Sequence, residues 1–577
     1  MKDKALLGNI MFSCLGAAAV TAYLSYVMGA DNSVYYYGFV LVPVFLVLAY
    51  RLKLLRDAAR LLEEVKEQWG KTVKKKRNLG VIRRYFDVLC DDKEGPYIDD
   101  QTWDDLNMDE IYTILDRNLT TAGEQVLYDI LRSPLIKKEP LLLRNTLIKQ
   151  FQINKELREK IQVALQGAGR LKEGDILDVL FGEHKKNDFM KIVCYAAAAA
   201  PIVIIALIPF ITSIAFVLFA LSLALNVYIH ANHGKKNDIS INSIGYLAHL
   251  IKAAGTISKI ENHELRPFLE ELKVISEKCK GIAKGTTRLG VPEGVDVLYD
   301  YIKIELLIEE RSYYRVIGDI QKYREELLRM YRILGEIDSY ISAASYRQEI
   351  KKYTEPEFVA EKRIVDIKGL IHPLIEEAVP NDISIGDGGI IITGSNMSGK
   401  STFLRSAGVA AIMAQTLYMV KADEYKASFF NIMTSISPGD NIMGGKSYYL
   451  GEAEAILRIL KGCSETLPTL CIVDEIFRGT NPVERVSASV EILEYLLGHN
   501  AVVLVATHDL ELPEILKGKY ECYYFTEDVD EKEGLEFDYR MRKGISPTRN
   551  AIKVLNYLGY PKEIVDGAEK RSLKHDA

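Results

Sequence analysis

A glycine-rich stretch in the C-terminal half of the chain has residue types that bind phosphate. Residues 394–401 read Gly-Ser-Asn-Met-Ser-Gly-Lys-Ser, the G-x-x-x-x-G-K-S string of a phosphate loop. An apolar run at 389–393 precedes the loop, and a helix-like run at 402–420 follows it. Such a turn presents backbone N–H groups and the positive end of a helix to an anion. Lys400 would reach the β- and γ-phosphates, and Ser401 would coordinate Mg²⁺. The pattern predicts a nucleoside triphosphate site with contacts from Gly394, Ser395, Asn396, Met397, Ser398, Gly399, Lys400, Ser401 and Thr402.

Two adjacent carboxylates end a second apolar run. Residues 470–473 read Leu-Cys-Ile-Val and are followed by Asp474 and Glu475. Burying paired acids at a strand end is costly unless a cation or water receives them. Asp474 suits a Mg²⁺-bound water, and Glu475 could orient or deprotonate a water that attacks the γ-phosphate. The acid pair would be weak evidence alone, but it is strong beside a phosphate loop.

A histidine ends a third apolar run. Residues 502–507 read as a buried parallel strand, and His508 follows directly. A lone histidine at a strand end usually serves packing or capping. Here the order of loop, acidic strand and histidine-ended strand resembles that of ABC-type ATPases, in which such a histidine senses the γ-phosphate. His508, Glu475 and Lys400 are therefore the expected catalytic residues.

These segments together resemble the MutS mismatch-repair family. Residues 391–402 are similar to its phosphate loop, which has Asn-Met inside. The resemblance also covers 474–480, 506–508, the Ile371-His372-Pro373 segment with Glu376, and 439–452, which is similar to the family's ABC signature. It implies an α/β ABC-type P-loop ATPase domain at 361–545. The implied reaction is ATP hydrolysis with Mg²⁺, held by Ser401 and Asp474.

The resemblance further implies a dimer. In that family two ATPase domains pair head to tail, and the signature segment of one closes the nucleotide site of the other. Ser447 would then reach the γ-phosphate bound by the partner, and Thr480 and Asn481 would lie at the dimer interface. An ordinary mobile loop at 444–447 is the alternative. A short segment at 546–577 is similar to the family's closing dimerisation helices.

A helical region precedes this domain. Residues 115–127 are similar to the opening of the MutS core, and apolar residues at helical spacing from 295 to about 353 resemble its lever helix. We expect an all-α core and lever region at 106–360. The first 105 residues do not resemble the domain with which MutS reads a mismatch, so mismatch recognition is not expected.

Two apolar hairpins predict about four transmembrane helices. The first comprises 5–30 and 34–50, within an N-terminal region of 1–52. The second, at 192–230, contains an uncharged run of 38 residues broken near Pro209. One helical span needs about 20 residues, so that run fits two spans. A buried hairpin in a soluble core is the alternative, although such a helix rarely lacks every polar stripe.

Charge orients these hairpins. Residues 51–80 hold ten Lys or Arg against four acids, a net charge of +6, while the whole chain carries −6. This basic juxtamembrane linker, placed at 53–105, is expected on the cytoplasmic side, where it can touch anionic lipid heads. A DNA-binding arm is the alternative. The seven cysteines show no C-x-x-C spacing and indicate free thiols in a reducing compartment.

The sequence thus predicts a multi-pass protein of the cell membrane, either inner or plasma membrane, with its N-terminus, core and ATPase domain in the cytoplasm. One hypothesis is a homodimeric, DNA-associated ATPase that binds mismatched or branched DNA. The other is a mechanoenzyme or transport-like ATPase that uses the same engine on a membrane substrate. A basic concave surface would favour the first hypothesis, and polar residues lining the spans would favour the second.

Overall fold

The structure is a computed structural model in which the chain forms two compact units. It describes residues 2–90, 95–182, 187–208, 210, 212–236, 241–286, 302, 304–350, 352–359, 363–386, 388–395, 398–436, 448–530, 534–545, 555 and 559–575. The first unit comprises Met1–Lys74, Asn118–Glu124 and Gln150–Ser345. The second comprises Lys75–Arg117, Gln125–Lys149 and Tyr346–Ala577. These limits come from contacts within the chain, and the domain boundaries expected from the sequence stay predictions.

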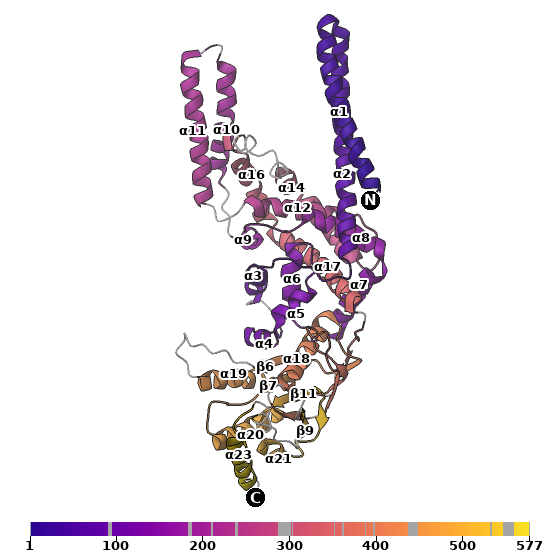
Figure 1. Ribbon diagram of the computed structural model, residues 1–577. Helices are drawn as coiled ribbons and strands as arrows, with labels where there is room; N and C mark the ends of the chain where they lie inside the picture. The colour runs from indigo at the N-terminus through magenta and orange to yellow at the C-terminus, as the bar shows by residue number, and fades with distance from the viewer. Residues whose placement is uncertain are drawn as a thin grey trace. The chain divides into compact units, whose positions relative to one another are not determined.

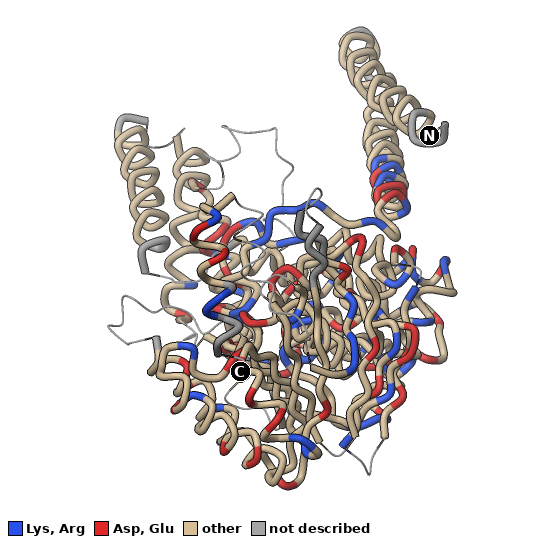
Figure 2. Tube along the Cα trace, turned by 60° about the horizontal axis from the view of Figure 1, so that its bottom comes forward, with Lys and Arg blue, Asp and Glu red and all other residues tan. Residues whose placement is uncertain are grey.

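The first unit begins with a long helical hairpin. Helix α1 (Lys2–Asp31) is followed by the 3₁₀ helix η1 (Ser33–Val40) and by α2 (Leu41–Gln68), which packs along α1 (Figure 1). Figure 2 shows that the charged residues of α2 gather in its C-terminal half. The apolar segment therefore continues directly into a charged helix up to Gln68.

A second hairpin follows in the same unit. It consists of α10 (Asp188–Leu207) and α11 (Thr212–Lys236), which pack against each other and carry few charges (Figures 1 and 2). By length and composition alone, four helices of the described chain could cross a membrane, two from each hairpin. Most of their apolar surface faces outward, since no more than 22% of each most apolar window is buried. Exposed apolar surface of this extent is typical of helices that contact a membrane or another protein.

The rest of the first unit is a helical body. Its core contains apolar side chains such as Leu247, Leu272 and Ile317. Asp338 accepts hydrogen bonds from the backbone N–H groups of Leu119 and Thr120, at 3.0 and 2.9 Å, which ties the segment before α6 (Thr121–Arg132) to α17 (Arg324–Ile350). The body comprises α8 (Lys155–Ala168), α9 (Ile176–Phe181), α12 (Ile241–Ile257), α13 (Arg266–Lys278), α14 (Lys280–Thr286), α16 (Ile308–Lys322) and most of α17 (Arg324–Ile350).

The second unit contains a six-stranded sheet with the strand order β12-β9-β4-β8-β7-β6. All neighbouring strands run parallel except β12, which is antiparallel to β9. The central strands are fully buried, which explains why their sequences read as continuous apolar runs. The strands are β4 (Gly389–Thr393), β6 (Asn431–Ser435), β7 (Thr469–Asp474), β8 (Ala501–Ala506), β9 (Tyr520–Tyr524) and β12 (Arg542–Lys543).

Helices cover both faces of this sheet. On one face, Val473 and Val503 pack against apolar side chains of three helices, among them Leu493 of α20. These helices are α19 (Tyr448–Gly462), α20 (Pro482–Gly498) and α21 (Glu511–Ile515). The other face packs against α18 (Lys400–Leu417), which is almost wholly buried. Gly408 of α18 permits close packing, because a Cβ there would lie 2.6 Å from the Leu106 side chain and 3.2 Å from that of Ile472 in β7. The C-terminal part of the chain is therefore a layered, mixed α/β domain.

Two smaller sheets and further helices complete this unit. The strand order β1-β5-β2-β3 forms one sheet, and β10 pairs antiparallel with β11. These strands are β1 (Glu357–Phe358), β2 (Val365–Leu370), β3 (Asn381–Ile385), β5 (Glu424–Ala427), β10 (Glu527–Asp530) and β11 (Gly534–Phe537). The helices are α3 (Leu79–Cys90), α4 (Asp100–Asp105), α5 (Met108–Leu115), most of α6 (Thr121–Arg132), most of α7 (Lys138–Ile153) and α23 (Lys562–His575).

Part of the basic segment is buried in the second unit. Lys75 and Arg77 both form ion pairs with Asp116, at 2.7 and 2.8 Å, and the Asp116 side chain is fully buried. The expectation that this basic segment meets lipid heads is wrong for these two residues. Their charge instead compensates a buried carboxylate, which would be strongly unfavourable if it were left unpaired.

Candidate functional site

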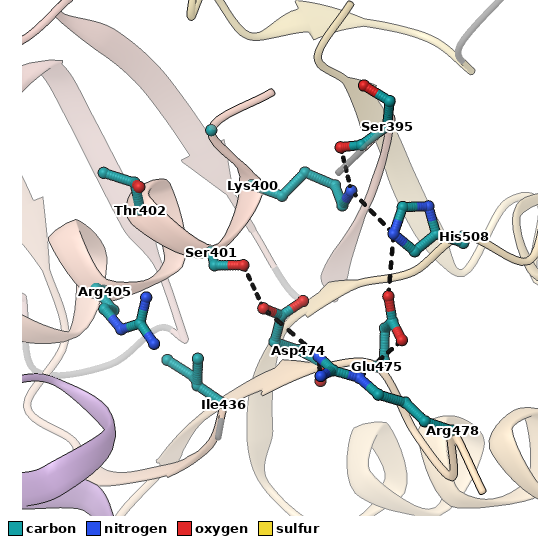
Figure 3. Close-up of a pocket in the computed structure, with 11 residues that line it drawn as sticks. Ser395, Lys400, Ser401, Thr402, Arg405, Ile436, Asp474, Glu475, Arg478 and His508 are labelled. Atoms are coloured by element: carbon teal, nitrogen blue, oxygen red, sulfur yellow. Dashed lines mark hydrogen bonds and ion pairs between the residues drawn. The ribbon is translucent and has the colours of Figure 1, made fainter. Parts of the chain in front are cut away.

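A polar cavity of about 440 Å³ lies where the carboxyl ends of β4, β7 and β8 meet the N-terminus of α18 (Figure 3). In parallel α/β sheets this edge gathers side chains from separate strands. The cavity is lined by Ser395, Gly399, Lys400, Ser401, Thr402, Arg405, Ile436, Asp474, Glu475, Arg478 and His508. Four segments far apart in sequence thus contribute to one site.

The glycine-rich loop folds around the ammonium group of its own lysine. Lys400 Nζ donates to the carbonyl oxygens of Gly394 and Ser395, at 2.6 and 2.7 Å. Gly394 has a φ of 141°, and a Cβ there would lie 2.5 Å from the Phe525 carbonyl oxygen. Only glycine fits such a turn. Ser398 closes the loop by donating to the Ser395 carbonyl oxygen at 2.8 Å, while Asn396 and Met397 lie outside the described residues.

Ser401 and Asp474 form a second pair in the cavity. The Ser401 hydroxyl donates to Asp474 Oδ2, and the Asp474 side chain is only 6% exposed. A hydroxyl and a carboxylate that face one space are hard oxygen ligands, the type that Mg²⁺ prefers when phosphate supplies further oxygens. This donor set fits the magnesium site expected from the sequence.

Glu475 is held by two neighbours. Its Oε1 lies 3.0 Å from Nε2 of His508, and its Oε2 lies 2.7 Å from Nε of Arg478. Burial alone would raise the pKa of the Glu475 carboxyl. The hydrogen bond with His508 and the nearby cations outweigh burial, so the pKa of Glu475 lies below its ordinary value. The group is therefore an ionised base at neutral pH.

The backbone at Glu475 is strained. Its φ is 62°, in the left-handed region that residues other than glycine seldom adopt. Phe477 follows with a φ of 59°. The Glu475 N–H donates to the Ala506 carbonyl oxygen at 2.9 Å, which ties the end of β7 to the end of β8. Strain held in this way is common where a side chain must be aimed at a reacting group.

A second cavity, of about 520 Å³, adjoins the first and shares Gly399 and Thr402 with it. Its lining includes His372 and the aromatic rings of Phe403, Phe525 and Tyr539. Burial, helped by the charges of Arg405 and Lys421, lowers the pKa of His372 to about 4. The histidine is thus neutral at pH 7, and the cavity offers flat apolar surfaces beside the polar site. No sequence motif had pointed to these rings, since 376–385 contains no aromatic residue.

Two residues expected at a dimer interface, Thr480 and Asn481, lie just before α20. Asn481 caps α20 by accepting a hydrogen bond from the Val483 N–H at 3.0 Å. Thr480 donates to Glu484 Oε2 at 3.3 Å. Neither residue lines the polar cavity, and their expected place at a dimer interface stays a prediction. Ser447 lies outside the described residues, so its expected role stays a prediction.

Sequence reasoning missed Arg405 and Ile436 and gave Arg478 no role of its own. Arg405 stands four residues after Ser401 on α18, so helical spacing alone puts both on one face. Its Nε donates to the Asp105 carbonyl oxygen at 2.8 Å. Ile436 comes from the end of β6, and no sequence signal links that position to the loop.

Fold and site together define a protein with a helical N-terminal region and a C-terminal mixed α/β domain, whose polar cavity opens at the sheet's carboxyl edge. Residues 390–575 match the family model described as MutS domain V. The C-terminal domain of the chain is thus similar to domain V of the MutS family.

Three relatives show the extent of this similarity, each described as DNA mismatch repair protein MutS. That of Thermus thermophilus is 31% identical over 310 residues, which is 52% of this chain and 37% of the relative. Those of Fervidobacterium nodosum and Thermotoga maritima are 31% and 32% identical, over 46% and 45% of this chain and 33% of each relative. The chain thus covers about a third of the length of these relatives.

Proposed function

We propose that this protein is a membrane-anchored MutS-type ATPase that hydrolyses ATP with Mg²⁺ in the polar cavity of an ABC-type P-loop domain. The observation that carries the proposal is the convergence of Lys400, Ser401, Asp474, Glu475 and His508 in one cavity. A cation for phosphate, a pair of oxygen ligands for Mg²⁺ and an ionised carboxylate are the parts that phosphoryl transfer to water requires. The similarity of residues 390–575 to MutS domain V supports the same reaction.

Each group has a defined task in this reaction. Lys400 would exchange its carbonyl partners for phosphate oxygens when nucleotide enters. Glu475 would accept a proton from the attacking water, so that water oxygen bonds to the γ-phosphorus while the bond to the β-phosphate oxygen breaks. His508 lies between Glu475 and Lys400, so a γ-phosphate bound at Lys400 would change the hydrogen bond that His508 makes with Glu475. Mg²⁺, when bound, supplies positive charge to the phosphate oxygens.

The nucleotide base is proposed to occupy the adjoining cavity. Phe403, Phe525 and Tyr539 offer aromatic surface there, and the two cavities share Gly399 and Thr402. A purine that stacks on such rings gains dispersion and hydrophobic contact. This arrangement would supply the base contact for which the sequence between His372 and the loop offers no aromatic residue.

The active form is proposed to be a homodimer. In it, Ser447 of one subunit would close the site of the other, with Thr480 and Asn481 at the interface and 546–577 assisting. ATP binding would bring the two domains together, and hydrolysis would release them.

DNA is the proposed partner of the helical body. A cavity of about 1490 Å³ in the first unit carries seven Lys or Arg against four acids, and such a basic concave surface attracts phosphate backbones. The names of the relatives, DNA mismatch repair protein MutS, support the same partner. The basic members of the lining are Arg170, Lys172, Lys252, Lys259, Lys273, Lys280 and Lys284.

The membrane anchor is proposed on the two apolar hairpins. Four helices have the length and composition of bilayer spans, and Arg51 begins a charged stretch right after the first hairpin. The proposed location is the cell membrane, with the N-terminus, the helical body and the ATPase domain in the cytoplasm. A mechanoenzyme or transport-like ATPase without DNA is the second candidate. The polar residue Asn226, which is buried in α11, favours this second candidate. Its amide nitrogen donates to the Glu305 carbonyl oxygen at 2.7 Å.

The test is the ATPase rate of the detergent-solubilised protein with and without homoduplex, mismatched and branched DNA at low and physiological salt. We expect DNA to stimulate the wild type at physiological salt. The double variant Lys252→Glu/Lys259→Glu should lose this stimulation but keep its basal rate. The matched control Lys137→Glu/Lys138→Glu changes the same charge on exposed residues outside the cavity. A rate indifferent to DNA would remove the DNA partner and favour the membrane substrate.

A further inference from the structure

The carboxylate of Asp105 is buried behind one wall of the polar cavity. The residue is only 2% exposed and comes from α4, far from the glycine-rich loop in sequence. Its Oδ2 accepts hydrogen bonds from the Thr434 hydroxyl at 2.7 Å and from the Ile436 N–H at 2.9 Å. Ile436 lines the cavity, so Asp105 fixes the backbone of a wall residue from outside the site.

Asp105 reaches the cavity by a second route. Its backbone carbonyl oxygen accepts the hydrogen bond from Nε of Arg405. Arg405 also lines the cavity, and Figure 3 shows it beside Thr402 and Ile436. A guanidinium anchored through Nε has a fixed plane, which favours directed contacts of its terminal nitrogens with an anion. One residue thus positions both an apolar wall and a cation of the phosphate site.

The same segment holds helix α19. Arg458 of α19 binds the Asp99 carboxylate and the Thr434 carbonyl oxygen, and lies 3.3 Å from the Thr102 hydroxyl. Asp99 is the N-cap of α4 and accepts from the Thr102 N–H at 2.8 Å. Figure 1 labels α4 beside β6, in agreement with the contacts between these elements. Asp99–Asp105 therefore joins α18, the end of β6 and α19.

We propose that α4 is a positioning element of the nucleotide site, in which Asp105 sets the place of Arg405 so that Arg405 contacts the phosphates of bound ATP. This inference rests on the proposed function and adds two residues to it. Asp105 lies outside the 390–575 match, so the site depends on a part of the chain that the domain match does not include. A purely structural role would tie α4 to the sheet without affecting nucleotide affinity.

The test measures KM for ATP and kcat of the full-length protein for Asp105→Asn, Arg405→Lys and the double variant. Thr434 and Ile436 both donate to Oδ2, and Oδ1 accepts from Gln101 Nε2 at 2.9 Å. An asparagine that keeps its oxygen toward Thr434 and Ile436 therefore turns its amide nitrogen toward the donor of Gln101. We expect each single variant to raise KM about five- to tenfold, with kcat changed less than threefold. The double variant should raise KM little further, because Asp105 acts on ATP affinity only through the position of Arg405.

The matched control is Asp104→Asn, an exposed carboxylate on the same helix. It should leave KM within twofold of wild type, alone and with Arg405→Lys. If Asp105→Asn fails to fold, Thr434→Val takes its place, because that variant removes the hydrogen bond from the Thr434 hydroxyl to Asp105. It is then combined with Arg405→Lys in the same way. A KM for Asp105→Asn equal to that of Asp104→Asn, or fully additive effects in the double variant, would overturn the inference.

Failure of the proposed function gives a different result. If the wild type releases phosphate no faster than Lys400→Ala, there is no ATPase and both proposals fall. If the wild type hydrolyses ATP in a Lys400-dependent way while the Asp105 and Arg405 variants behave like the control, only the positioning role falls.

Discussion

The imidazole Nε2 of His508 lies 3.0 Å from Oε1 of Glu475. The same nitrogen lies 3.3 Å from Nζ of Lys400. A neutral ring can donate through Nε2 to the carboxylate or accept there from the ammonium group, but it cannot do both at once. Phosphate binding at Lys400 would withdraw that ammonium from the ring and favour the tautomer that donates to Glu475. The histidine is thus placed to link phosphate occupancy to the orientation of the base.

Replacing Glu475 by glutamine should abolish hydrolysis but not binding. The amide keeps the shape of the side chain and cannot accept the proton of the attacking water, so kcat should fall at least about 100-fold. The affinity for ATP, measured with a fluorescent analogue, should stay within about threefold. Glu491→Gln, at an exposed position on α20, serves as control. Equal losses of binding and rate would mean that Glu475 acts on nucleotide affinity instead.

Replacing His508 by alanine should move the pH profile as well as the rate. The hydrogen bond from His508 is the largest influence that lowers the pKa of Glu475 against the effect of burial. Its removal should raise that pKa and shift the acidic limb of kcat to higher pH, with a 10- to 100-fold lower plateau. The profile is measured from pH 4 to 9. An unchanged acidic limb would show that His508 does not interact with the base during turnover.

The sequence predicted the local parts of this site better than their surroundings. Residues 389–393, 470–473 and 502–507 read as buried strands from apolar content alone, and the ends of β4, β7 and β8 lie within one residue of these limits. Each strand carries its polar residue directly at its end, so parallel pairing brings those residues together. Within each segment, the apolar run and the polar residue that ends it are only a few residues apart, a range over which hydrophobic pattern and turn chemistry are informative.

Asp105 and Arg405 could not be found in this way. They are 300 residues apart in sequence, and their hydrogen bond depends on how α4 packs on β6 and α18. The aromatic rings of the second cavity show the same limit, since Phe403, Phe525 and Tyr539 come from three separate segments. The ion pairs of Lys75 and Arg77 with Asp116 were likewise invisible, because charge counting does not reveal a partner some 40 residues away.

Replacing Ser401 by alanine should raise the Mg²⁺ concentration needed for half-maximal activity about tenfold. The variant removes one oxygen ligand and also the hydrogen bond to Asp474, leaving the carboxylate to bind alone. Saturating Mg²⁺ should restore most of the rate. The neighbouring Thr402→Ala provides the comparison, since it removes a hydroxyl from the same cavity lining without touching Asp474. An identical Mg²⁺ dependence in the two variants would contradict the assignment of Ser401.

Buried His372 should make stability fall with acidity. Its folded pKa of about 4 lies below the ordinary value of 6.5, so the unfolded chain binds the proton more readily. The stabilisation is complete above pH 6.5 and is lost as pH falls toward 4, a total of about 3 kcal/mol. His372→Asn keeps an acceptor for the Leu374 N–H and does not titrate. The variant's Tm should vary less than that of wild type between pH 6.5 and 4, and parallel curves would refute the assignment.

The proposed membrane anchor predicts that the protein stays in the membrane pellet after alkaline extraction. Cysteine labelling in a variant with all seven native cysteines replaced by serine tests the topology: Asn32→Cys, between α1 and α2, should react with an impermeant maleimide in intact cells. Ser464→Cys, in the α/β domain, should react only after permeabilisation. The reverse pattern would contradict the orientation, and release of the chain at alkaline pH would contradict the anchor itself.

The most direct test of the account is phosphate release from Mg²⁺-ATP by the purified full-length protein, compared with Glu475→Gln and Glu491→Gln at pH 7.5. The account predicts steady turnover in the wild type and in Glu491→Gln, and a rate at least about 100-fold lower in Glu475→Gln. A wild-type rate no higher than that of Glu475→Gln, in protein that still binds ATP, would contradict the claim that this cavity hydrolyses nucleotide.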